Sequence, residues 1–243
     1  MQNIIIFGAS GHGSVVLDCL EKEGKYNVIG FVDSFKEKGS LINGYQVLGS
    51  EIDLPYLISR FNITGGLVAI GDNWTRKLIV DRISKIVPYF NFVNTIHPDA
   101  VLGKDVQLGC GNVIMPGSII NANSIIHDFC ILNSQSILEH DCLMESYSSL
   151  APSSCCGGNV SIGSFSSICL GASVVNNIVL GQHSVVGAGS LVVDHFGDNL
   201  VIYGSPARII RKRAVGEPYL STPKRQQFFK LDSFDEFKSN LSI

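Results

Sequence analysis

The chain has 243 residues, of which 45% are hydrophobic and 16% are charged, and its formal net charge is −3. This composition is typical of a folded protein with a low density of charge. It excludes an intrinsically disordered chain and gives no basic surface of the kind that binds nucleic acid. The length allows one large domain or two modest ones.

The seven cysteines form no CxxC pair. Their odd number and scattered positions argue against a disulfide framework and a zinc ribbon, so we expect reduced thiols and no metal. The N-terminus lacks a basic region ahead of its short apolar run, and no stretch approaches the roughly 18 apolar residues of a membrane span. We therefore predict a cytoplasmic protein without a membrane span.

Residues 1–95 alternate between patterns typical of strands and of helices. Short apolar runs predict strands at 3–8, 26–33 and 66–71, and helical spacing predicts helices at 13–24 and 74–86. Strands that alternate with helices favour a small parallel sheet, so we predict an α/β domain of Rossmann type.

Three loops of this domain are candidates for ligand binding. The turn "GASGHG" (8–13) joins a predicted strand to a helix, where glycines allow close approach and the helix N-terminus favours an anion. The turn is not a G-x-G-x-x-G motif, so we do not predict an NAD site. Asp33 ends the next strand and "GDN" (71–73) ends the third. Such loops meet at one edge of an open α/β sheet, which is where ligands bind.

From Ala100 onward the chain divides into sixteen hexads, from AVLGKD to SLVVDH. The third residue of each hexad is Leu, Ile, Val or Met, except for Cys156. A repeat this short is typical of a β-solenoid in which the aliphatic residue points into the core of a triangular prism. Three hexads form one coil, so residues 18 apart should stack, and sixteen hexads give about five coils.

The tripeptide Glu139-His140-Asp141 interrupts hexads that, after the first, contain no Lys or Arg. Titratable groups are costly to bury unless they are paired or used. Imidazole suits general-base catalysis near neutral pH, and an adjacent carboxylate raises its basicity and fixes its tautomer. Because His140 follows the core residue Leu138 by two positions, we expect it near a corner and facing outward.

Together these features resemble the NeuD/PglD-like family of bacterial nucleotide-sugar acetyltransferases, which is related to the sialic acid O-acetyltransferases. The resemblance is carried by the hexad solenoid, by the series "FGASGHG", "GFVD" and "AIGDN", and by the closing "GSPAR" (204–208). It implies a Rossmann-like nucleotide-sugar-binding domain at 1–95, a left-handed parallel β-helix acyltransferase domain at 96–207, and a basic segment and tail at 208–243. It also implies a homotrimer with active sites between subunits.

The activity implied by the resemblance is acetyl-CoA-dependent N-acetylation of a nucleotide-linked amino sugar in surface glycan biosynthesis. Transfer would be direct, with His140 as the general base and Asp141 as the carboxylate that tunes it. The implied substrate-binding residues are Ser10, Gly11, His12, Asp33, Ser34, Asn73 and Asn133. The residues implied to bind acetyl-CoA are Ser149, Gly158, Leu170, Ala188, Arg208 and Arg211.

Ser149 departs from the pattern, because relatives commonly carry a second histidine there, close to the thioester. Its backbone N–H would still polarise the thioester carbonyl, as an oxyanion-hole donor does. The cations of "ARIIRKR" (207–213) are expected at the nucleotide end of CoA. In the tail, Phe228, Leu231, Phe234 and Phe237 are spaced for one apolar helical face.

Several alternatives stay open. Within the enzyme class these are O-acetylation of a sialic acid and, with few histidines at the needed spacing, a zinc enzyme resembling the γ-class carbonic anhydrases. A third is a non-catalytic trimeric scaffold that binds a nucleotide-sugar. His127 is an alternative base that could pair with Glu145, and Cys142 is an alternative nucleophile on an inward position. His183 and His195 are expected in surface turns, and His97 is expected to be structural.

Overall fold

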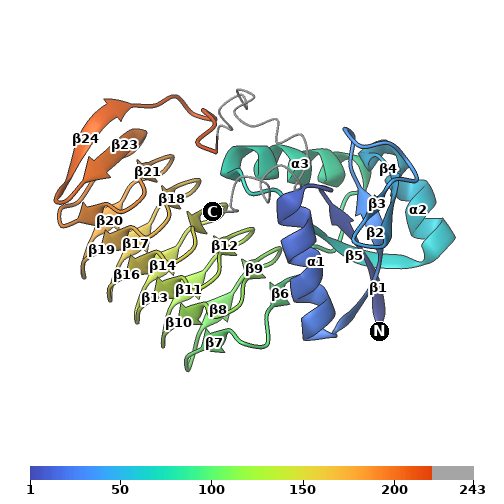
Figure 1. Ribbon diagram of the computed structural model, residues 1–243, viewed down its shortest axis with the longest axis horizontal. Helices are drawn as coiled ribbons and strands as arrows, with labels where there is room; N and C mark the ends of the chain where they lie inside the picture. Colours follow the sequence, from blue (N-terminus) through green and yellow to red (C-terminus); the bar gives the residue numbers. More distant parts are fainter. Residues whose placement is uncertain (221–243) are drawn as a thin grey trace, which may run out of the picture.

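A computed structural model describes residues 1–220 and shows an α/β unit beside a long triangular solenoid (Figure 1). The apolar helical face predicted for Phe228, Leu231, Phe234 and Phe237 lies outside the described residues. Within residues 1–220 no helix is long and apolar enough to cross a membrane.

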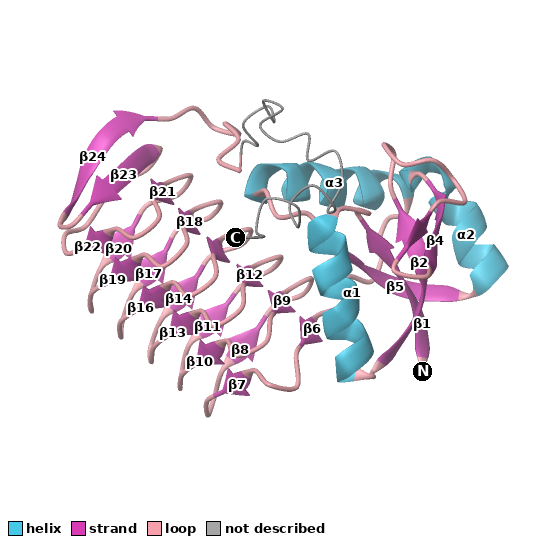
Figure 2. Cartoon of the chain, viewed as in Figure 1, coloured by secondary structure: helices cyan, strands magenta, loops and turns pink. Residues whose placement is uncertain are grey.

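The N-terminal unit is a five-stranded sheet in the order β3-β4-β2-β1-β5. Its strands are β1 (Gln2–Phe7), β2 (Tyr26–Val32), β3 (Leu41–Ile42), β4 (Tyr45–Gly49) and β5 (Ile63–Val68). All neighbours are parallel except β3 and β4, which form an antiparallel hairpin. The helices are α1 (Gly11–Glu23), α2 (Leu54–Phe61) and α3 (Asn73–Ile86) (Figure 2). The predicted strands and helices are thus present, with ends that differ by up to three residues.

The β3–β4 hairpin and α2 were not predicted, although the sequence carries a signal for each. Asn43 and Gly44 both have positive φ between the two short strands, as a tight turn favours. A short 3₁₀ helix (Glu51–Asp53) leads into α2, whose first turn holds Pro55 and whose C-cap, Asn62, is left-handed. These elements are too short for hydrophobic periodicity to find them.

The solenoid has three faces of parallel two-residue strands. One face holds β7 (Val101–Leu102), β10 (Ile119–Ile120), β13 (Ile137–Leu138), β16 (Cys155–Cys156), β19 (Ser173–Val174) and β22 (Leu191–Val192). The second holds β8 (Gln107–Leu108), β11 (Ile125–Ile126), β14 (Leu143–Met144), β17 (Ser161–Ile162) and β20 (Val179–Leu180). The third holds β6 (Thr95–Ile96), β9 (Val113–Ile114), β12 (Ile131–Leu132), β15 (Ser149–Leu150), β18 (Ser167–Ile168) and β21 (Val185–Val186), followed by an antiparallel pair, β23 (Leu200–Gly204) and β24 (Ala207–Lys212).

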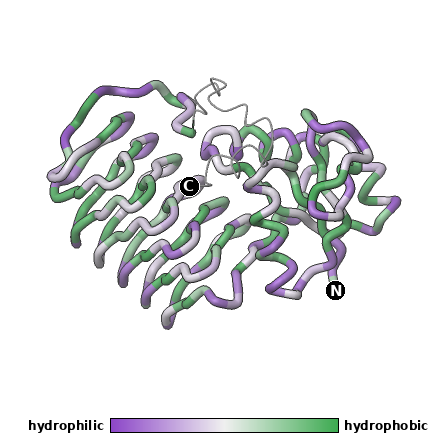
Figure 3. The backbone as a smooth tube through the Cα atoms, in the orientation of Figure 1, coloured by the Kyte–Doolittle hydropathy of each residue, from purple (hydrophilic) through white to green (hydrophobic). Residues whose placement is uncertain are grey.

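The predicted register of the hexads is confirmed. Residues 18 apart pair, as Ile131 does with Ser149, and the third-position residues from Ile114 to Val192 are buried in one continuous core. Hydrophobic and hydrophilic segments accordingly alternate along every coil (Figure 3). The last residue of every hexad from Asp105 to Gly189 has φ between +53 and +70°, so it forms the corner. This left-handed position explains why Gly, Asn and Asp are common there.

Four corner residues stack into an aromatic ladder, which we define as Phe129, Tyr147, Phe165 and His183. Their ring centroids are 5.0, 5.2 and 4.6 Å apart in that order, and the rings are nearly parallel. The ladder faces the N-terminal unit, since Trp74 of α3 packs 5.3 Å from Phe165. The expectation of a surface turn at His183 is therefore wrong, because the residue is buried at the junction.

The buried guanidinium of Arg76 also joins the two units. From α3 it donates to the carbonyl oxygens of Phe129 and Tyr147 on the ladder corner, at 2.9 and 3.1 Å. It also donates to the carbonyl oxygens of Ile70 and Gly71 at the end of the sheet. Because a buried charge must be hydrogen-bonded, these contacts fix the loop after β5 against the solenoid.

Candidate active site

A cavity of about 380 Å³ lies where the N-terminal unit, the third solenoid face and the segment after β24 meet. We call it the junction cavity. It is lined by His12, Gly71, Ile131, Asn133, Ser149, Ala151, Pro152, Ser167, Cys169, Leu170, Tyr219 and Leu220. Most of these side chains are apolar, and a few polar groups converge among them, which is the usual make-up of a small-molecule site.

His12 brings the glycine-rich turn to this cavity. The turn follows β1, and Ser10 is the N-cap of α1 with a side chain that makes no capping hydrogen bond. Nε2 of His12 is buried and has no hydrogen-bond partner within residues 1–220. Burial, reinforced by the nearby Arg76 charge, lowers the pKa of His12 to about 4. The imidazole is therefore neutral at pH 7 and has one ring nitrogen free for a ligand.

Asp33 and Ser34 sit beside a separate small hollow with Phe35 and Glu51. The Asp33 carboxylate accepts from the backbone N–H groups of Ala9 and Phe35, each at 2.7 Å, and so holds two loops together. The Ser34 hydroxyl donates to the carboxylate of Glu51, a buried side chain that no sequence pattern predicted. Phe35, which is 94% exposed, stands at the rim of this hollow.

The two predicted asparagines differ in their surroundings. Asn73 is buried, donates to the carbonyl oxygen of Ser166 at 3.1 Å and accepts from Arg76 at 2.7 Å. Both ends of its amide are thus used within the chain, and it does not line the junction cavity. Asn133 does line the cavity, where its Nδ2 donates to the Leu150 carbonyl oxygen at 2.8 Å.

Three hydroxyls form a chain along one wall of the junction cavity. Ser149 Oγ donates to Ser167 Oγ at 3.1 Å, and the phenol oxygen of Tyr219 lies 3.1 Å from Ser149 Oγ. The Tyr219 hydroxyl also donates to the Gly71 carbonyl oxygen at 3.3 Å. No sequence signal pointed to Tyr219 or Ser167, since Tyr219 lies beyond the hexads and Ser167 is an ordinary strand residue.

His140 and Asp141 form an exposed pair at a solenoid corner. His140 Nδ1 lies 2.7 Å from Asp141 Oδ2, and Asn123 donates to the other carboxylate oxygen at 3.0 Å. These two hydrogen bonds, that of His140 first, lower the pKa of Asp141, so the carboxylate is ionised at neutral pH. The backbone of Asp141 has a left-handed φ of 58°, which turns its carboxylate back toward the His140 imidazole.

Gly158 leaves room for the His140 ring one coil away. A Cβ added at Gly158 would lie 2.6 Å from both Cε1 and Nε2 of His140. The ring therefore lies against the Gly158 backbone. His140 and Gly158 form one group, whereas His12, Asn133, Ser149 and Leu170 line the junction cavity, and the single chain does not bring the two groups together.

The two arginines predicted to bind CoA each lie near an acidic side chain of the same chain. Arg211 donates to both carboxylate oxygens of Glu217, at 2.5 and 3.2 Å, and this contact chiefly lowers the pKa of Glu217 to about 2. Arg208 is exposed, with Nη1 3.6 Å from Asp194. Ala188 is exposed on the last full coil.

The two alternative catalytic groups fit the geometry poorly. Glu145 accepts from the backbone N–H and the hydroxyl of Ser164, and no hydrogen bond joins it to His127 within residues 1–220. The thiol of Cys142 is buried and donates to the Gly157 carbonyl oxygen at 3.2 Å. Burial also raises the pKa of Cys142, which disfavours the nucleophilic thiolate.

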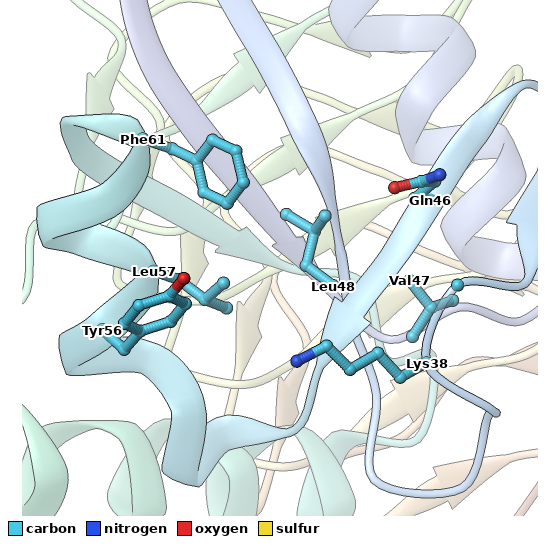
Figure 4. Close-up of a pocket in the computed structure, with 8 residues that line it drawn as sticks. Lys38, Gln46, Val47, Leu48, Tyr56, Leu57 and Phe61 are labelled. Atoms are coloured by element: carbon cyan, nitrogen blue, oxygen red, sulfur yellow. The ribbon is translucent and has the colours of Figure 1, made fainter.

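A second cavity, of about 240 Å³, lies between β4 and α2 (Figure 4). It is lined by Lys38, Gly39, Gln46, Val47, Leu48, Tyr56, Leu57 and Phe61. None of the predicted site residues lines it, so the junction cavity is the better candidate for the chemistry.

Comparison with known proteins agrees with this arrangement. Residues 3–83 match the PglD N-terminal domain. A histidine mutant of perosamine N-acetyltransferase from Caulobacter crescentus, solved with CoA and GDP-perosamine, is 33% identical, with a TM-score of 0.81 over 86% of this chain and 97% of its own. The chain belongs to the PglD-like nucleotide-sugar acetyltransferases.

Two further relatives share this architecture. The acetyltransferase domain of PglB from Neisseria gonorrhoeae, solved with acetyl coenzyme A, is 29% identical, with a TM-score of 0.78 over 86% of this chain and 99% of its own. GDP-perosamine N-acetyltransferase from Escherichia coli O157:H7 is 27% identical over 85% of this chain and 96% of its own length. The predictions of an acyltransferase, and of a left-handed β-helix after a Rossmann-like domain, are confirmed.

Proposed function

We propose that this protein transfers the acetyl group of acetyl-CoA to the amine of a nucleotide-linked amino sugar, as a step in surface glycan biosynthesis in the cytoplasm. The observation that carries the proposal is the 33% identity to perosamine N-acetyltransferase over nearly all of that enzyme, whose structure contains CoA and GDP-perosamine. The divisions at 1–95, 96–207 and 208–243 would then correspond to sugar binding, acyl transfer and a basic tail.

The chemistry assigned to the His140–Asp141 pair is proton transfer. With Nδ1 of His140 held by Asp141 at 2.7 Å, the other ring nitrogen is the one that accepts the proton of the attacking amine. The amine nitrogen attacks the thioester carbonyl directly, and backbone N–H groups would stabilise the tetrahedral oxyanion. The N–H of Ser149, expected from the sequence to do so, is not free for this role, because it donates to the Ser166 carbonyl oxygen at 3.0 Å. Collapse breaks the C–S bond, and the proton passes from the imidazolium to the departing thiolate of CoA.

A homotrimer is part of the proposal, because His140 lies outside the junction cavity of its own chain. In a cyclic trimer, His140 of the partner subunit would complete each cavity. The acetyl-CoA pantetheine would run between subunits past Gly158, Leu170 and Ala188, with Arg208 and Arg211 toward its nucleotide. Ser10, Gly11 and His12 at the start of α1 suit the diphosphate, and Asp33 and Ser34 lie beside the hollow that would take the base.

The test is release of free CoA from acetyl-CoA, detected with a thiol reagent. The acceptor panel is GDP-perosamine, UDP- and dTDP-linked amino sugars, and free sialic acid. We expect turnover with one nucleotide-linked amino sugar, and a fall in kcat of about 10²- to 10⁴-fold in His140→Ala. The matched control is His127→Ala, which removes the exposed alternative base and should retain activity.

Two results would contradict the proposal. Turnover with sialic acid alone would favour O-acetylation. Absence of CoA release with every acceptor, together with failure of acetyl-CoA to bind, would favour a non-catalytic scaffold.

A further inference from the structure

The segment that follows β24 runs back from the last coil of the solenoid to the N-terminal unit near α3 (Figure 1). We call residues 213–220 the C-terminal strap. Its last two residues, Tyr219 and Leu220, line the junction cavity together with groups from the other two units. Three parts of the chain line this cavity: the N-terminal α/β unit, the solenoid hexads and the strap. Only the strap lies outside both the α/β unit and the hexads.

Several contacts hold the strap in place. At the start of the strap, the backbone N–H of Arg213 donates to the Asn199 carbonyl oxygen at 2.9 Å. Nη1 of the Arg213 side chain donates to the His183 carbonyl oxygen at 3.1 Å. Arg213 Nη2 donates to the Glu217 carbonyl oxygen, and the Glu217 side chain is bound by Arg211. These bonds close a turn within the strap and tie that turn to the last coil.

The middle of the strap rests on the N-terminal unit. A Cβ added at Gly216 would lie 2.7 Å from Nε1 of Trp74, so the glycine backbone is packed directly on the indole, and φ at Gly216 is +77°. Glycine is required here both for the close approach and for the positive φ. The strap therefore has one defined path from the solenoid, over α3, to the cavity.

At the end of this path, Tyr219 projects a phenol toward the cavity. Its hydroxyl donates to the Gly71 carbonyl oxygen at 3.3 Å, and its oxygen lies 3.1 Å from Ser149 Oγ, so the phenol sits between the loop after β5 and the solenoid wall. Burial raises the pKa of the Tyr219 phenol, which therefore stays protonated and remains a donor at neutral pH. A phenol offers an apolar ring and one hydroxyl, a combination suited to a sugar ring with its C–H faces and polar substituents.

We propose that the C-terminal strap is a wall of the acceptor site and that Tyr219 is a positioning residue for the amino sugar. Its hydroxyl holds the strap to the loop after β5 through the Gly71 carbonyl oxygen, and its ring limits how the pyranose enters between the α1 turn and the solenoid. The inference rests on the acetyl transfer proposed above. It predicts that Tyr219 affects binding of the sugar acceptor more than binding of acetyl-CoA.

The first test compares Tyr219→Phe and Tyr219→Ala with wild type, using GDP-perosamine or whichever acceptor of the panel wild type turns over fastest. Loss of one neutral hydrogen bond in Tyr219→Phe should raise KM for that acceptor about fivefold, and loss of the ring as well in Tyr219→Ala about 30-fold. KM for acetyl-CoA should stay within about twofold of the wild-type value in both variants. The melting temperature of Tyr219→Phe should stay close to that of wild type. Tyr89→Phe, at an exposed tyrosine, is the matched control.

An unchanged KM for the acceptor in both variants would overturn the proposal. Equal rises in the KM values of the acceptor and of acetyl-CoA would also overturn it, since a Tyr219 contact that only stabilises the fold would affect both substrates alike.

A second test does not depend on turnover. Cys169 lines the junction cavity beneath the strap and is half-buried, whereas Cys110 is exposed on another part of the solenoid. Alkylation by iodoacetamide, followed by peptide mass spectrometry, should proceed about tenfold faster at Cys169 in Tyr219→Ala than in wild type. The rate at Cys110 is the internal control and should not change.

Equal Cys169 rates in wild type and Tyr219→Ala would show that the strap does not cover the cavity. If wild type releases no CoA with any acceptor and does not bind acetyl-CoA, the proposed function fails, and the Cys169 rates still decide whether the strap is a wall of the cavity.

Discussion

The position of the His140 imidazole is set by two neighbours. Asp141, turned by its left-handed φ, holds Nδ1, and Gly158 provides the space in which the ring lies. The tripeptide that contains His140 was recognisable in the sequence because titratable residues are rare in these hexads. The contact with Gly158 was not, since the 18-residue stacking indicates which residues are neighbours but not how closely two side chains approach.

This contact leads to the first prediction, for Gly158→Ala. The new methyl group would sit 2.6 Å from the imidazole and must displace it, whereas the backbone tolerates alanine because φ at Gly158 is not positive. We expect kcat to fall by about tenfold or more, because small displacements of a catalytic group are costly, with little change in thermal stability. Steady-state kinetics and a melting curve test this.

The matched control is Gly197→Ala, since a Cβ at Gly197 meets no atom within 4 Å. Equal activity of Gly158→Ala and Gly197→Ala would show that the observed ring position is not the catalytic one.

His12 makes stability depend on pH. Its pKa is lowered from 6.5 to about 4, so between these values the unfolded chain binds a proton that the folded chain does not. The free energy of unfolding should therefore be highest above about pH 6.5 and fall by up to about 3 kcal/mol as pH drops to about 4. Urea unfolding of wild type and His12→Asn at several pH values tests this.

The two stability curves should run parallel above pH 6.5, and the variant's should fall less steeply below it. Parallel curves over the whole range from pH 7 to 4 would exclude His12 as the source.

At the scale of the elements, the hexads were predictable because their third position is Leu, Ile, Val or Met in fifteen of the sixteen, and the structure buries the third-position residues from Ile114 to Val192. The sixth position carries a second pattern that hydropathy does not reveal. Phe129, Tyr147, Phe165 and His183 are each 18 residues apart, and only coil stacking turns that spacing into a ladder of rings. The ladder in turn forms the surface on which α3 packs.

Phe165→Ala should remove the centre of this ladder. Phe165 stacks on Tyr147 and His183 and meets Trp74 edge-on, so its loss leaves a gap between the solenoid and α3. We expect the free energy of unfolding to fall by about 2 kcal/mol, below the usual cost at a fully buried site, because Phe165 is only half-buried. Denaturant unfolding is the measurement.

Phe35→Ala is the matched control, because the Phe35 side chain is 94% exposed. Its unfolding free energy should change by no more than about 0.5 kcal/mol. A loss as large in Phe35→Ala as in Phe165→Ala would show that the ladder contributes no specific stability.

At the scale of the whole molecule, the site depends on how distant segments meet. Arg76 joins the loop after β5 to the solenoid corner, and Tyr219 reaches Ser149 across 70 residues of sequence. Neither contact was predictable, because each depends on the angle between the two units rather than on any local pattern. Local patterns did predict the α/β unit and the solenoid, and the family resemblance supplied four of the twelve residues that line the junction cavity, namely His12, Asn133, Ser149 and Leu170.

In the proposed trimer, each active site combines the junction cavity of one chain with His140 of the partner subunit. Two inactive variants test this arrangement: His140→Ala, which lacks the base, and Ala151→Trp, whose indole would fill the junction cavity. After the two are unfolded, mixed in equal amounts and refolded together, random trimers should recover about a quarter of wild-type CoA release, because one site in four pairs an intact base with an intact cavity. Each variant refolded alone should stay inactive. No recovery in mixed trimers that sediment normally would contradict the claim and place the whole reaction within one chain.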